Sequence, residues 1–199
     1  MSFNSTWTSL KANAVLSARL AAREACTPAA RAAFALWCAE RLLTSQAQHG
    51  PRLPPAIEKI TVRGVEVAWQ SLLRTEDRSL LKSFQEQMEA QLPDDEPEGP
   101  LPSLADVLSI AVYAVATARE GRPEDAAAAG AAMADAVDAA DEAANSEERL
   151  GLYEAELARQ EKLSQELPAI LSDAKTGVDA LRQRAQEDQV GASLPRAAR

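Results

Sequence analysis

The chain is 199 residues long, 46% apolar and 26% charged, and its net charge is −9. At this length a single domain is the default, and the chain can bury enough surface to fold without disulfides or a metal ion. The acidic balance argues against nucleic-acid binding, which relies on basic stripes, and against binding to a membrane surface, which relies on a Lys-rich amphipathic face.

The acidic residues are concentrated in the middle of the chain. Residues 1–75 carry nine Lys or Arg and four Asp or Glu, residues 76–148 carry four and eighteen, and residues 149–199 carry eight of each. Such a distribution of charge can steer a basic partner toward one surface of the folded protein.

In the first half of the chain the helix boundaries are clear, and no alternating run of β-branched residues predicts a strand. Thr27 followed by Pro28 is typical of an N-cap and a first helical position. Gly50 ends that helix, and Pro54 precedes the next one. The predicted helices of this half cover residues 8–25, 28–48, 55–74 and 76–91.

The second half begins with a loop at residues 93–102, which holds four prolines and four acids and marks the main internal boundary. Ser103 with Asp106 resembles a capping box that opens a helix, and Gly121 ends it. Pro123 opens an Ala-rich helix. The predicted helices of this half cover residues 103–120, 123–144 and 146–185.

The last of these segments repeats apolar and small residues at steps of three and four, which is the seam of a helix packed nearly parallel to its neighbours. Pro168 and Gly177 interrupt it, so we expect either a kink or two helices. The seam consists of Leu150, Tyr153, Leu157, Gln160, Ser164, Leu167, Leu171, Ala174, Val178, Leu181 and Ala185.

These signals predict an all-α fold, a single bundle of about seven or eight helices. The domain covers residues 1–190, with sub-halves 8–91 and 103–190, and a frayed tail follows at 191–199. The most apolar stretch, Leu104–Ala118, is too short and too polar to span a bilayer, and the N-terminus lacks the apolar core of a signal peptide. We therefore expect a cytoplasmic protein.

Residue types that carry catalysis or bind metals are sparse and scattered. His49 is the single histidine, Cys26 and Cys38 lack the spacing of a metal or redox motif, and no Gly-rich phosphate loop occurs. We expect two reduced, mostly buried thiols, no catalytic residue, no metal and no cofactor. A catalytic pair of carboxylates, which needs no fixed spacing in sequence, is left open as an alternative.

The Ala-rich helix carries the most distinctive group of acids. Asp135, Asp138 and Glu142 are three and four residues apart, so they share one helix face, and Asp141 borders them. This face could be a solvated surface, a docking ridge for Lys and Arg of a partner, or a divalent-cation site. As a docking ridge it would be extended by the acids of the preceding loop, Asp94, Asp95, Glu96 and Glu98.

Arg41 is the other residue that stands out, because it falls on the apolar arc of its helix formed by Phe34, Trp37, Cys38 and Leu42. A charge there either reaches out to water along its stem or forms a buried ion pair with an acid of another helix. Asp106 is the candidate partner, because it interrupts an otherwise apolar segment.

The order of these features resembles that of the YjaG-like bacterial family of small all-helical proteins of unknown function. The resemblance covers about residues 34–165 and departs from the family after Leu43, where Thr44-Ser45 stand in place of an aromatic residue and a proline. Predicted helical immunity proteins of bacterial toxin systems look similar around Cys38–Arg41. The resemblance rests on Trp37–Leu43, Ile57–Leu72 with Ala68-Trp69, Leu92–Asp95, Asp106–Ala118, Asp135 with Asp138, and Glu154–Leu157.

Two functional hypotheses follow. The first is a non-enzymatic acidic binding protein, most concretely an immunity or inhibitor protein that docks a basic protein such as a toxin. The second is a self-associating structural or regulatory protein that dimerises through the seam at 150–185. Neither involves nucleic acid or a membrane.

Overall fold

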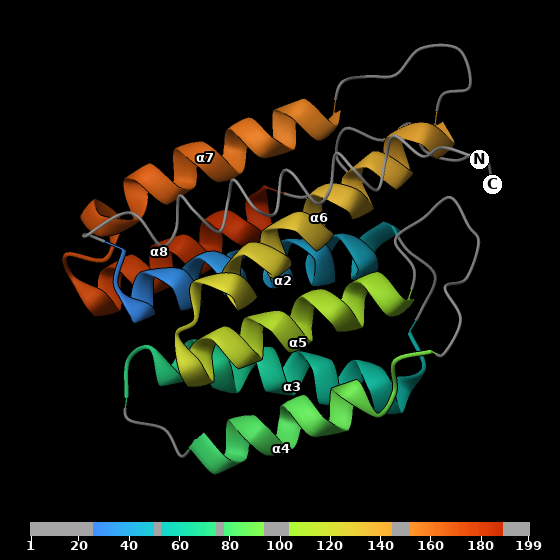
Figure 1. Ribbon diagram of the computed structural model, residues 1–199, viewed down its shortest axis with the longest axis horizontal. Helices are drawn as coiled ribbons and strands as arrows, with labels where there is room; N and C mark the ends of the chain where they lie inside the picture. The colour runs from blue at the N-terminus through green and yellow to red at the C-terminus, as the bar shows by residue number, and fades with distance from the viewer. Residues whose placement is uncertain (1–25, 50–52, 75–77, 94–103, 145–151, 189–199) are drawn as a thin grey trace.

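The computed structural model describes residues 26–49, 53–74, 78–93, 104–144 and 152–188, and these form seven α-helices and no strand (Figure 1). The predicted all-α bundle is therefore confirmed, whereas the helix predicted at 8–25, the interior of the acidic loop and the tail at 191–199 lie outside the described residues. The helices are α2 (Pro28–His49), α3 (Pro55–Ser71), α4 (Arg78–Glu89), α5 (Leu104–Glu120), α6 (Pro123–Ala144), α7 (Leu152–Ile170) and α8 (Ala174–Glu187).

Each of these helices runs antiparallel to the one before it (Figure 1). As a result, α4 ends and α5 begins at the same end of the bundle where α6 ends and α7 begins. Helices α4 and α7 lie on opposite sides, with α2 and α5 between them. No helix in the described part of the chain is both long enough and apolar enough to cross a lipid bilayer.

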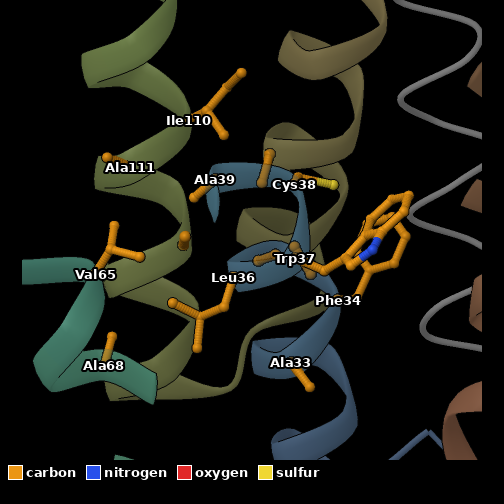
Figure 2. Packing of buried hydrophobic residues seen from close by; sticks show 14 of the residues in the cluster. Ala33, Phe34, Leu36, Trp37, Cys38, Ala39, Val65, Ala68, Ile110 and Ala111 are labelled. Carbon is orange, nitrogen blue, oxygen red and sulfur yellow. The ribbon is translucent and has the colours of Figure 1, made fainter. Parts of the chain in front are cut away.

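Helix α2 lies at the centre of the bundle and packs against α3, α5, α6, α7 and α8. Its middle is apolar on nearly every side, which is typical of a fully enclosed helix. Leu36 faces Val65 and Ala68 of α3, whereas Phe34 and Trp37 point to the other side of α2 (Figure 2). The buried apolar residues of both halves of the chain form one continuous core around this helix.

The ends of α2 and α5 meet in a contact that requires glycine. Thr27 caps α2 as predicted, because its Oγ1 accepts a hydrogen bond from the Ala30 N–H at 3.1 Å. Gly121 ends α5 with a φ of +70°, and a Cβ there would lie 2.6 Å from the Cβ of Pro28. The Gly121 carbonyl accepts a hydrogen bond of 2.6 Å from Arg31, which joins the two helix ends.

The long last segment forms two helices, one of the two outcomes that the sequence left open. Pro168 lies inside α7, and the break falls three residues later, at Leu171–Asp173. Asp173 caps α8 by accepting a hydrogen bond from the Thr176 N–H at 3.1 Å. Both cysteines are free and buried, as expected.

Candidate functional site

Helix α6 carries six acids and no basic residue. Glu124 and Asp125 lie in its first turn, where negative charge is favoured by the helix dipole. The other four acids, Asp135, Asp138, Asp141 and Glu142, lie in its second half.

Asp141 has a structural role that the sequence did not reveal. Its side chain is buried, and its Oδ2 accepts a hydrogen bond of 3.2 Å from the backbone N–H of Leu152, the first residue of α7. A carboxylate at this position accepts from one of the N–H groups that have no partner within α7. Its negative charge is also favoured by the positive end of the dipole of α7. The prediction that Asp141 belongs to an exposed docking ridge was therefore wrong.

Asp135 and Asp138 lie nearer the surface: Asp135 is exposed and Asp138 is half-buried. Both act on Tyr153 of α7, whose pKa is raised above 10.0, first by burial of the ring and then by the charges of Asp135, Asp138 and Glu154. Two carboxylates that act on one phenol form a single patch of negative potential. We call Asp135, Asp138 and the adjacent Tyr153 the acidic face.

The remaining acids of the predicted ridge are not placed by the structure. Glu142 belongs to α6, but its side chain lies outside the described residues, as do Asp94, Asp95, Glu96 and Glu98. The helix ends that flank the acidic loop, the end of α4 and the start of α5, lie at the end of the bundle where α6 ends (Figure 1). Within the described ranges, no group of three or more His, Cys, Asp or Glu side chains is arranged to hold a metal ion.

Arg41 forms the predicted buried ion pair, but with a different acid. Its Nη1 and Nη2 donate to Oε1 and Oε2 of Glu156 on α7 at 2.8 and 3.0 Å, and both side chains are 0% exposed. Its guanidinium also lies 4.2 Å from the centre of the Trp37 ring. Asp106, on α5, was therefore the wrong choice of partner, and Arg41 does not reach out to water.

Further polar contacts allow this charge pair to exist in the core. Arg159 donates to Glu156 at 3.0 Å, and the Gln160 side chain donates to Glu156 at 3.0 Å and to the Gly130 carbonyl at 2.9 Å. The Asp188 carbonyl accepts from Arg41 Nε at 2.8 Å. A buried ion pair is tolerated when further hydrogen bonds reach its two members, and these contacts supply them, although Oε1 of Gln160 has no hydrogen-bond partner among the described residues.

A second group of contacts surrounds Glu40, the neighbour of Arg41 on α2. Its carboxylate accepts hydrogen bonds from Trp69 at 3.2 Å, from Gln186 at 2.8 Å and from Arg182 at 3.4 Å. Together, the two groups hold α7 and α8 on α2. We call them the charge cluster, which consists of Glu40, Arg41, Glu156, Arg159, Gln160, Arg182, Gln186 and Asp188.

Cys38 lies next to this cluster but is not a reactive thiol. Burial raises the pKa of the Cys38 thiol far above its usual range, and the nearby charge of Glu156 raises it further, whereas Arg41 opposes the shift. Because thiolates rather than thiols are nucleophiles, Cys38 is a packing residue.

Sequence reasoning missed Glu156, although a usable signal was present. Glu156 falls on the same helix arc as the seam positions Tyr153 and Gln160, so it is a charge on a buried face, as Arg41 is. Most of the described seam packs within its own chain, although Ala174 is exposed and Tyr153, Leu157 and Leu171 are half-buried. Its buried members are Gln160, Ser164, Leu167, Val178, Leu181 and Ala185.

Comparisons of this chain with protein-family models, with curated proteins and with solved structures find no match. The resemblance to the YjaG-like family and to helical immunity proteins therefore stays a prediction.

Proposed function

We propose that this protein is a non-enzymatic binding protein that docks a basic protein partner on its acidic face. The most concrete form of this proposal is an immunity or inhibitor protein that covers a basic toxin in the cytoplasm. The observation that carries the proposal is that Asp135 and Asp138 lie close together, beside Tyr153, on a helix that has no basic residue.

The position of these two acids supports a role beyond solubility. Asp135 and Asp138 are three residues apart on one face of α6, so their like charges repel each other. A cationic partner that docks beside Asp135 and Asp138 would relieve this repulsion, and the ring of Tyr153 offers a surface on which a guanidinium can stack.

The second hypothesis, self-association through an exposed seam at 150–185, has less support, because the buried seam positions already pack against their own chain.

The test uses three immobilised forms of the full chain to capture partners from an extract of the native cell. The first is the wild type, and the second is the face variant, Asp135→Asn with Asp138→Asn. The third is a matched control, Glu86→Gln with Glu89→Gln, which removes two exposed acids at the same spacing from α4, on the opposite side of the bundle.

We expect a basic protein that is retained by the wild type and the control, lost from the face variant and eluted by salt. Contradictory results would be a captured partner that is not basic, or a basic partner that the face variant and the control retain equally. Removing the same charge from α4 separates a local docking surface from the general effect of an acidic protein.

A further inference from the structure

The seam pattern continues through the turn between α7 and α8, although the helix does not. Leu167, Leu171, Ala174 and Val178 follow one another at steps of four, three and four across the break. If α7 and α8 formed one straight helix, each residue would turn 100° around its axis. The buried side chains of both helices would then all lie within about 100° of arc on one face. These side chains are Glu156, Gln160, Leu163, Ser164, Leu167, Val178, Leu181 and Ala185.

The turn keeps part of the helical hydrogen bonding. The Leu171 N–H still donates to the Leu167 carbonyl at 2.9 Å, as in an α-helix, and the Ser172 N–H donates to the Ala169 carbonyl at 3.3 Å, as in a 3₁₀ turn. Asp173 is extended, with φ −109° and ψ 106°. A change of backbone conformation centred on this residue would join α7 and α8. Pro168 adds no cost to that change, since it already lies inside α7.

The contacts of α8 are mainly with α2, far away in sequence, and less with its neighbour α7. Arg182 and Gln186 bind Glu40, the Asp188 carbonyl binds Arg41, and Val178, Leu181 and Ala185 belong to the core. A second copy of the chain offers an identical set of partners, so α8 can dock on either copy with the same contacts.

We propose that α7 and α8 join into one helix in a minor population, and that two such chains exchange α8 to form a dimer. In this dimer each α8 lies on α2 of the other copy and completes the charge cluster there. Because α8 makes the same contacts in both states, the monomer and the dimer differ in the turn and in the entropy lost on association, so a substitution in the turn changes the dissociation constant of the dimer.

A substitution of Gly177 tests the equilibrium between the monomer and the exchanged dimer most directly. In the closed turn a Cβ at this position would lie 2.0 Å from the Ile170 carbonyl oxygen, which is part of the backbone and cannot turn aside. In a continuous helix Ile170 would lie seven residues earlier along the same helix and would leave this position open. Gly177→Ala is therefore expected to shift the equilibrium toward the dimer by tenfold or more.

Asp173→Ala tests the same turn without disturbing any buried residue. It removes the cap of α8 from the closed turn and supplies a good helix former for the joined helix. The population of the joined helix is expected to rise about fivefold per chain, and the association constant of the dimer, which contains two chains, about 25-fold. Thr176→Ala is the control, because Thr176 is exposed and helical in both states, and the N–H that binds Asp173 remains.

The measurement is sedimentation velocity of the full chain over a range of concentrations, after long incubation at the highest. We expect both turn variants to form more dimer than the wild type and Thr176→Ala to match it. If Gly177→Ala unfolds, Asp173→Ala alone decides the outcome. Folded monomers of Asp173→Ala at every concentration, up to about 0.5 mM, would overturn the proposal.

A crosslink between thiols then distinguishes exchange from ordinary face-to-face pairing. Glu40→Cys and Gln186→Cys are combined with Asp173→Ala, and a short bismaleimide replaces direct oxidation, because the ends of the longer Glu40 and Gln186 side chains are in contact at 2.8 Å. Crosslinking of the isolated dimer is expected to link the two chains covalently. Crosslinks formed only within each chain would mean that α8 remains on α2 of its own chain, which contradicts the exchange.

Discussion

The buried pair of Arg41 and Glu156 gives the strongest prediction for stability. In Arg41→Met, Glu156 keeps Arg159 and Gln160 as partners but loses the guanidinium that binds both its oxygens. Removing one member of a buried pair costs about 3–5 kcal/mol in other proteins. Since Arg159 is partly exposed and compensates in part, we expect a loss near the lower limit, about 3 kcal/mol.

A double variant separates the interaction from the burial of each charge. Replacing both members, Arg41→Met with Glu156→Leu, removes the charges together and is expected to cost about 1 kcal/mol or less. Urea denaturation followed by circular dichroism measures each free energy of unfolding. With a slope of about 2 kcal/mol/M, the loss in Arg41→Met lowers the midpoint by about 1.5 M.

Arg63→Met serves as the matched control, because Arg63 binds Glu66 at the same distance of 2.8 Å, but with side chains 55% and 36% exposed. We expect a loss below about 0.5 kcal/mol for that exposed pair. The reasoning would be refuted if Arg41→Met cost no more than Arg63→Met. It would also be refuted if the double variant cost the sum of its two single changes, since the pair would then contribute no coupling energy.

Three further predictions concern single residues. Asp141→Ala should lower the free energy of unfolding by about 1 kcal/mol through loss of the cap on α7, whereas exposed Asp135→Ala should change it little; urea titration of both decides, and equal effects would contradict the capping role. Because the pKa of Tyr153 is raised in the folded protein, its neutral form adds stability below pH 10.0 that is lost as pH rises through the raised pKa. Asp138→Asn should lower this pKa in a titration of phenolate absorbance, and an unchanged value would show that Asp138 does not act on the phenol. Cys38 should resist alkylation at pH 8 until urea unfolds the chain, and rapid modification of the native protein would contradict its raised pKa.

The parts of the fold that the sequence predicted are those with local causes. Thr27 and Pro28 define the start of α2, and Gly121 the end of α5, because caps and positive φ angles depend on a few neighbouring residues. Helical periodicity likewise placed Arg41 on an apolar arc, and of the two outcomes that this left open the structure shows the buried ion pair.

The parts that the sequence did not predict depend on contacts between distant segments. Glu156 lies 115 residues from Arg41, and local patterns mark both Glu156 and Asp106 as charges on apolar faces without deciding between them. The role of Asp141 depends on where α7 begins in space, at Leu152. The repeat at 150–185 could not locate the turn at Leu171–Asp173, because its spacing is the same on both sides and through the break.

The association rate constant of the captured basic partner, measured against ionic strength for the wild type and the face variant, tests the central claim most directly. If Asp135 and Asp138 guide docking, the rate constant of the wild type falls steeply as salt is added. The face variant then associates more slowly, and its rate constant depends less steeply on ionic strength. Equal rate constants and equal salt dependence for the two proteins would contradict a docking role for the acidic face.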